Sequence, residues 1–127
     1  MPQGGDKGDV KMVTQTGRKV DLSFVRGDTY SFDIDVNIKT VPDEIYFTVK
    51  EDADGTPLIQ KRLTVDNGII NKGNGVYNVQ LNPEDTKDFD CNLMYKWDLQ
   101  IVIESYKRTP VYGTLNLIED ITKEADE

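Results

Sequence analysis

The sequence contains no histidine and only one cysteine, and these absences exclude several kinds of site. A single cysteine can form neither an intrachain disulfide nor a zinc site built from several cysteines. Without histidine, the chain lacks the usual general base of Ser–His–Asp and Cys–His nucleophiles and the commonest metal ligand. We therefore expect Cys91 to be a lone thiol in the loop before the longest strand, with no redox role.

Long apolar runs are also missing. No stretch approaches the roughly 20 residues that span a bilayer, and residues 1–10 combine glycines with charges, unlike a signal peptide. We expect synthesis in the cytoplasm and no membrane partner. The chain has 23 acidic and 15 basic residues, a net charge of −8, which repels nucleic acid phosphates. We therefore expect no nucleic acid partner.

The alternation of apolar and polar residues predicts β-strands along most of the 127 residues, a length that suits one domain. Residues 30–36 are the clearest case, because four large apolar side chains alternate there with three small polar ones. About seven strands follow one another, with turn signals every 8–12 residues. The predicted strands are 20–25, 30–36, 45–50, 58–65, 76–81, 93–104 and 111–118, with a short apolar piece at 69–70 and one helical turn at 82–88.

This pattern predicts an all-β protein, an antiparallel immunoglobulin-like β-sandwich with one short helical turn. We expect a flexible lead-in at 1–16, in which 11–13 could add an edge strand, a sandwich domain at 17–119 and an acidic tail at 120–127. The inward side chains of the strands should form the core. These are Phe32, Ile34, Phe47, Val49, Tyr77, Val79, Trp97, Leu99, Ile101 and Leu115.

Four short motifs recur in one known family. They are G-D-T-x-x-F at 27–32, D-T at 85–86, Y-x-W-D at 95–98 and G-x-L-x-L followed by D-I-T within 113–122. Together they resemble the small immunoglobulin-like domains encoded among tail and baseplate genes of phages and prophages of Gram-positive and gut bacteria. The resemblance runs from Val20 onward, although the middle of the chain fits only by strand pattern.

The resemblance implies a virion structural or adsorption module that is not an enzyme and holds no cofactor. Its partners would be other virion or tail proteins, with a component of the host surface as a further candidate. It would be made in the bacterial cytoplasm and carried in the virion tail. In such sandwiches a tyrosine near the start of the sixth strand bonds back to the preceding corner, and Tyr95 is placed for this. Trp97 stands where antibody domains carry a disulfide cysteine.

Three motifs could indicate function but have simpler structural interpretations. Arg-Gly-Asp at 26–28 spells an integrin-recognition tripeptide, yet it lies between two strands and is predicted to be a turn. Asp52 and Asp54 begin a calcium-loop pattern without the later acidic ligands that such a site needs, which favours a hairpin turn. Asp33 and Asp35 could pair as catalytic carboxylates, but alternating acids on an outer strand face usually form a solvated surface.

We expect Tyr46, Tyr106 and Tyr112 to be exposed, which makes them candidate interface residues, although outer-face tyrosine is also ordinary in strands. The last strand, 111–118, carries no charge, so we predict that it is an open sheet edge and docking surface, with Asn116 on it. Strand 58–65 is the other candidate edge, where Lys61 and Arg62 would discourage pairing. The isolated domain should be monomeric or weakly self-associating.

A carbohydrate-binding β-sandwich module is the alternative function. Such modules present aromatic platforms to sugars, whereas the single tryptophan here is predicted to face inward.

The lack of a metal-ligand cluster predicts that stability is independent of metal ions. Thermal melts recorded with a chelator and with millimolar calcium should give the same melting temperature. A rise of several degrees with calcium would restore the Asp52–Asp54 site as a candidate.

Overall fold

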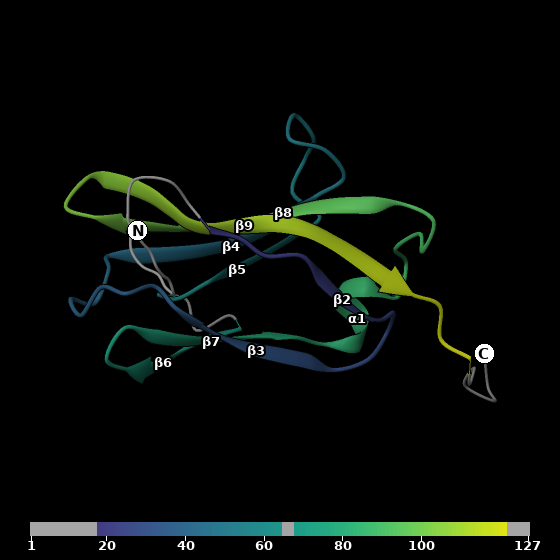
Figure 1. The fold of residues 1–127 in the computed structure, drawn as a ribbon, viewed down its shortest axis with the longest axis horizontal. Coiled ribbons are helices and arrows are strands. Elements are labelled where there is room, and N and C mark those ends of the chain that lie inside the picture. Colours follow the sequence, from purple (N-terminus) through teal and green to yellow (C-terminus); the bar gives the residue numbers. More distant parts are fainter. Residues whose placement is uncertain (1–17, 65–67, 122–127) are drawn as a thin grey trace, which may run out of the picture.

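Residues 18–64 and 68–121 are described by the computed structural model, and they form two β-sheets packed face to face (Figure 1). The larger sheet contains β1 (Arg18–Lys19), β2 (Leu22–Val25), β4 (Glu44–Lys50), β5 (Ile59–Arg62), β8 (Met94–Ile103) and β9 (Tyr106–Ile118). The smaller sheet contains β3 (Tyr30–Asp35), β6 (Ile69–Gly73) and β7 (Val76–Leu81), and the single helical turn is α1 (Pro83–Thr86).

The predicted all-β immunoglobulin-like sandwich with one helical turn is confirmed. The described residues hold nine strands rather than about seven, because 18–25 is divided into two strands and 69–73 forms a full one. The expected lead-in at 1–16, its candidate edge strand at 11–13, and the tail beyond 121 lie outside the described residues.

The strand order is β1–β9–β8–β4–β5 in the larger sheet, with β2 also on β9, and β3–β7–β6 in the smaller sheet. Both β1 and β2 run parallel to β9, and the other pairs are antiparallel. The prediction that 111–118 is an open edge is therefore wrong. β9 is hydrogen-bonded to β8 on one side and to β1 and β2 on the other, and the lack of charge in 111–118 reflects this enclosed position. The prediction that β5 is an edge is confirmed.

The core lies between the sheets and matches the sequence expectation closely. Nine of the ten predicted core residues are buried, and Phe32 is partly buried. Phe32 belongs to β3, an edge strand of the smaller sheet, which explains its residual exposure. The side chain still packs on the core.

Three aromatic rings occupy the centre, where antibody domains place a disulfide against a tryptophan. Trp97 on β8 lies 6.1 Å from Phe32 on β3 and 5.5 Å from Phe47 on β4, measured between ring centroids. The indole is only 3% exposed. Burying rings of this size contributes about 2–3 kcal/mol each, so the aromatic cluster joins the two sheets without a covalent link.

The indole also fixes the path of the N-terminal strands. Trp97 Nε1 donates a hydrogen bond to the carbonyl oxygen of Val20, at 3.0 Å, and the Val20 amide donates to the carbonyl of Tyr112, at 2.7 Å. The Val20 carbonyl lies so close to Gly113 that a Cβ atom there would be 1.8 Å from the oxygen. Asp21 accepts hydrogen bonds from the amide and hydroxyl of Thr114. The break between β1 and β2 is thus a crossing over Gly113.

The tyrosine corner predicted at the start of β8 is present. The backbone amide of Asp90 donates a hydrogen bond to the phenol oxygen of Tyr95, at 2.8 Å, and the ring of Tyr95 lies 4.4 Å from that of Phe89. These contacts hold the segment between α1 and β8 against the end of the sandwich, and they place Cys91 there with intermediate exposure.

The connection between β8 and β9 is shorter than the gap between the predicted strands 93–104 and 111–118. Glu104 and Ser105 alone make the turn, with φ angles of 48° and 77°. Two-residue hairpin turns of this kind usually contain Asn-Gly or Asp-Gly, so the sequence gives no signal here. Lys107 and Arg108 consequently belong to β9. Further along, the register of β8 and β9 shifts between Leu99 and Ile101.

The close approach of the Val20 carbonyl to Gly113 predicts that a larger residue at position 113 destabilises the fold. Gly113→Ala should lower the free energy of unfolding by about 2–4 kcal/mol, because the new methyl group must displace the Val20 carbonyl and its bond to the indole. Urea denaturation of both proteins measures the change. Gly73→Ala is the control: its Cβ would meet nothing within 4 Å, so only its positive φ should matter, at about 1 kcal/mol. Equal losses in the two variants would contradict the proposed crossing.

Candidate functional site: the outer face of the larger sheet

The Arg-Gly-Asp tripeptide is a structural turn, as predicted. Gly27 has a φ of 83°, and its amide donates to the hydroxyl of Thr86, which is fully buried. The guanidinium of Arg26 binds the carboxylate of Asp120 and the carbonyl of Phe89, each at 3.2 Å. Because the arginine is held by the fold, the tripeptide is not presented as a free loop tip.

The two other acidic motifs are also structural. Asp52 accepts a hydrogen bond from the amide of Asp54 and lies in the hairpin loop between β4 and β5. Asp33 and Asp35 are exposed on β3, and Asp33 accepts a hydrogen bond from Asn78 on β7. Within 18–64 and 68–121, no group of three or more His, Cys, Asp or Glu side chains could hold a metal ion. The helix in the same part of the chain is too short to cross a membrane.

The outer face of the larger sheet carries two neighbouring hollows. Alternation turns the even-numbered side chains of β4 and β8 away from the core, since their odd-numbered neighbours are buried. A shallow hollow of about 450 Å³ lies on this face, and it is lined by Tyr46, Thr48, Lys50, Pro57, Gln60, Asp98, Gln100, Val102 and Lys107. A second hollow of about 350 Å³ includes Lys96 and Tyr112 and meets the first at Thr48, Lys50 and Asp98.

Asp98 occupies the junction of the two hollows. It is partly buried on β8, opposite Thr48 on β4 and Tyr112 on β9. Burial raises the pKa of this carboxyl, and the nearby charge of Lys50 offsets part of the rise. The carboxylate of Asp98 makes no hydrogen bond or ion pair with any other residue in the described ranges. A desolvated carboxylate without a partner is a group that a binding protein could satisfy.

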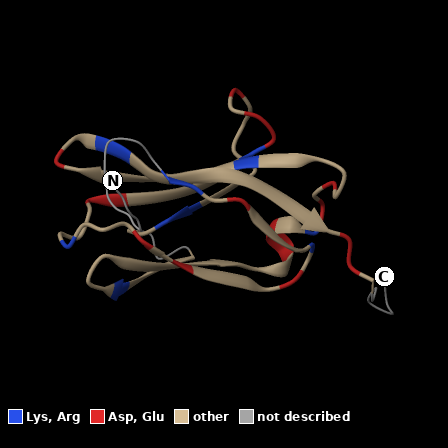
Figure 2. Cartoon of the chain, in the orientation of Figure 1, with Lys and Arg blue, Asp and Glu red and all other residues tan. Residues whose placement is uncertain are grey.

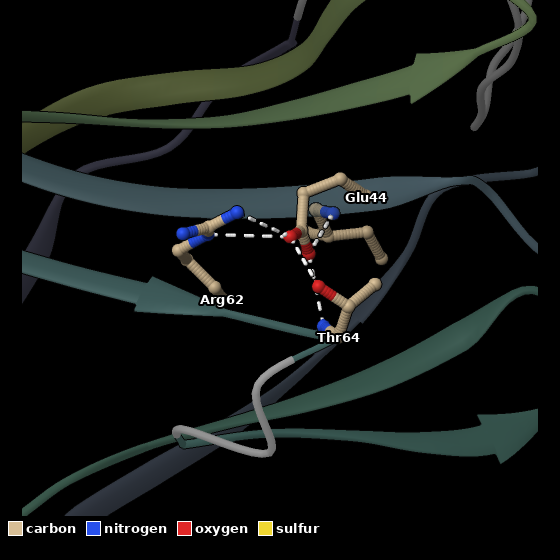
Figure 3. A network of polar contacts seen from close by, with 4 residues as sticks. Glu44, Arg62 and Thr64 are labelled. Atoms are coloured by element: carbon tan, nitrogen blue, oxygen red, sulfur yellow. Dashed lines mark hydrogen bonds and ion pairs between the residues drawn. The ribbon is translucent and has the colours of Figure 1, made fainter.

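A polar network at one end of β4 supports this face (Figure 3). Glu44 is 8% exposed, and its carboxylate accepts hydrogen bonds from Arg62, from the amide and hydroxyl of Thr64, and from the amide of Ile45. The guanidinium of Arg62 also lies over the ring of Tyr46, 5.1 Å from its centroid. The network fixes both the β5 edge and the tyrosine beside it.

The ionised form of Glu44 is strongly favoured. Burial acts to raise the pKa of this carboxyl, but hydrogen bonds from Thr64, Ile45 and Arg62 outweigh it and lower the pKa from 4.5 to about 2. Sequence reasoning missed Glu44, because a lone acid at the boundary between a loop and a strand carries no periodic signal.

Lys61, one of the two basic residues expected to discourage pairing at the β5 edge, lies on the core side of the strand. Lys61 faces the interior, is 7% exposed, and its ammonium lies 3.0 Å from the carboxylate of Asp85 in the α1 turn. The alternation of β5 places it on the same side as buried Ile59. An inward-pointing charge on an edge strand also disfavours pairing with another sheet.

The four predicted interface residues lie in different places. Tyr46 and Tyr112 line neighbouring hollows on the outer face, and Tyr112 is 41% exposed. Asn116 pairs with Met94 further along the same face, and Tyr106 is 76% exposed at the β8–β9 hairpin. The structure therefore brings two of the four together, and their role as an interface stays a prediction.

No protein-family model and no curated protein matches the chain. Among solved structures, it is similar to a chain of the ZIG-8–RIG-5 IG1–IG1 heterodimer, with 15% identity, a TM-score of 0.45 and coverage of 86% of this chain and 90% of that one. It is also similar to the first immunoglobulin-like domain of human CD48, with 11% identity, a TM-score of 0.45 and coverage of 92% and 96%. The assignment of the fold rests on the strand order and pairing described above.

The Glu44 network predicts how the free energy of unfolding depends on pH in the acidic range. A carboxyl whose pKa is lowered by folding stabilises the folded state above its ordinary pKa of 4.5, and this contribution is lost as the pH falls towards about 2. It amounts to at most about 3 kcal/mol, and screening around Arg62, whose side chain is 41% exposed, reduces it. Glu44→Gln should lower stability at pH 7 and flatten its decline between pH 4.5 and 2.

Urea denaturation across this pH range measures the effect, and the exposed Glu51→Gln serves as the control. If Glu44→Gln and the parent lost stability in parallel on acidification, the network would not be the source of the acid sensitivity.

Proposed function

We propose that this protein is a non-enzymatic immunoglobulin-like module of a phage or prophage tail or baseplate, serving a structural or adsorption role. It acts through protein–protein contacts made by the outer face of the larger sheet. The observation that carries the proposal is the junction of the two hollows, where partly buried Asp98 lacks an ion-pair partner among the described residues.

The composition of this face suits contact with a protein. Tyr46 and Tyr112 offer large, rigid contact surfaces, and tyrosine is enriched at protein interfaces. Gln60 and Gln100 add side-chain amides that can both donate and accept hydrogen bonds. The hollows are shallow and open, so a convex protein surface fits them better than a small enclosed ligand does.

The phage setting is supported by the residues that carry the family resemblance. The amide of Gly27, in the first motif, is hydrogen-bonded to Thr86, in the second. Tyr95 and Trp97, in the third, form the corner and the centre of the core, and Gly113, in the fourth, lies under the strand crossing. The motifs thus act together as parts of one scaffold. The carbohydrate-binding alternative lacks its usual platform, since Trp97 is buried.

The proposed location in a phage tail can be tested on particles from a strain that carries the gene. After prophage induction and density-gradient purification, immunoblots should detect the chain in particle fractions at a constant ratio to the major tail protein. A chain that stays in the soluble fraction while intact tails sediment would contradict the proposal.

The docking face can be tested in the same assay by steric blocking. Thr48→Trp places an indole where the hollows meet and should reduce incorporation into particles at least tenfold. Ser31→Trp, on the exposed face of β3 in the smaller sheet, is the matched control and should leave incorporation unchanged. The reverse result would assign docking to the smaller sheet.

A further inference from the structure

Charge is distributed very unevenly over this molecule. The chain as a whole has 15 basic and 23 acidic residues. The strands of the larger sheet nevertheless carry eight basic side chains and only two acidic ones, and most described acids lie in turns and loops (Figure 2). The eight are Arg18, Lys19, Lys50, Lys61, Arg62, Lys96, Lys107 and Arg108, and the two are Glu44 and Asp98.

Two of these basic groups form ion pairs within the chain. Lys61 points inward to Asp85, and Arg62 is bound by Glu44. The other carboxylate on these strands, Asp98, has no ion pair within the described ranges.

Three further lysines lie on the outer face. Lys50, Lys96 and Lys107 form no ion pair with a carboxylate in the part of the chain that the structure describes. Lys50 and Lys96 stand directly opposite each other across β4 and β8. Like charges in this position destabilise a sheet, so the fold gains nothing from their pairing. Lys50 and Lys107 line one hollow, and Lys50 and Lys96 line the other.

We infer that the partner of this face is an acidic protein surface, whose carboxylates meet Lys50, Lys96 and Lys107. Asp98, at the centre, marks the point where that surface presents a hydrogen-bond donor or a neutral group instead of an acid. This inference rests on the proposed docking function and specifies its chemistry. A second copy of this chain is the competing occupant, and sedimentation distinguishes it from an acidic partner.

The inference can be tested by NMR titration of the ¹⁵N-labelled full chain at about 50 mM salt. The probe is a synthetic 12-residue peptide of alternating Glu and Gly, and a Lys–Gly peptide of the same length is the control. The acidic peptide should shift the amide signals around Lys50, Lys96 and Lys107, whereas the basic peptide should leave them in place. Binding should weaken as salt increases, because exposed charges are screened.

Two double variants with the same change in net charge distinguish the effect of the outer-face lysines from the effect of the net charge of the whole chain. Lys50→Glu/Lys107→Glu should weaken binding of the acidic peptide at least tenfold. Lys39→Glu/Lys87→Glu changes the net charge equally, at exposed loop positions, and should change binding less than threefold. Asp98→Asn should strengthen binding about twofold or more, since it removes the acid at the centre of the face. Equal weakening by both double variants would overturn the inference.

Two further measurements identify other occupants. If hyaluronan shifts the same amides and the acidic peptide does not, the partner is an anionic polysaccharide and the inference is wrong. It is also wrong if sedimentation shows a dimer that Lys50→Glu/Lys107→Glu dissociates, because the occupant is then a second copy.

Failure of this inference is distinguishable from failure of the proposed function. If Thr48→Trp blocks incorporation into particles and Lys50→Glu/Lys107→Glu does not, the face docks a partner that is not acidic. If the chain is absent from particles but binds the acidic peptide through these lysines, the inferred acidic partner is supported and the proposed role in a phage tail is wrong.

Discussion

The hydrogen bond from the Trp97 indole to the carbonyl of Val20 is the contact on which the rest of the structure depends. It requires the ring to be seated in the core against Phe32 and Phe47, and it requires a glycine at 113 so that the carbonyl can approach. Once it forms, β1 and β2 lie along β9 and close that edge of the β9 backbone. A single indole thus links the packing of the two sheets to the path of the N-terminal strands.

Much of this fold is predictable from the sequence, and the exceptions have physical causes. Alternation identifies β7 at its observed bounds and most of the core, because a strand with one buried face leaves a period of two. The parallel pairing of β1 and β2 with β9 joins residues about 93 positions apart, and periodicity says nothing about such partners. Glu44 and the Glu104–Ser105 turn were missed because neither has a distinctive residue pattern.

The outer face of the larger sheet is likewise only partly predictable from local sequence. The exposure of Tyr112 follows from the alternation along β9. The meeting of Thr48, Lys50 and Asp98 depends on which strands are neighbours, which only the structure provides. The residues that close the sandwich, by contrast, belong to the short motifs that the sequence displays.

The parallel alignment of the first and last strands has a mechanical consequence. Arg18 lies beside Val111, and Val25 lies beside Ile118, so the incoming chain and the outgoing chain leave this strand pair at opposite ends. Tension applied between the two termini would load the hydrogen bonds of the pair in shear, all at once, instead of opening them one after another. We expect a domain with this connectivity to yield abruptly rather than gradually when it is stretched between its termini.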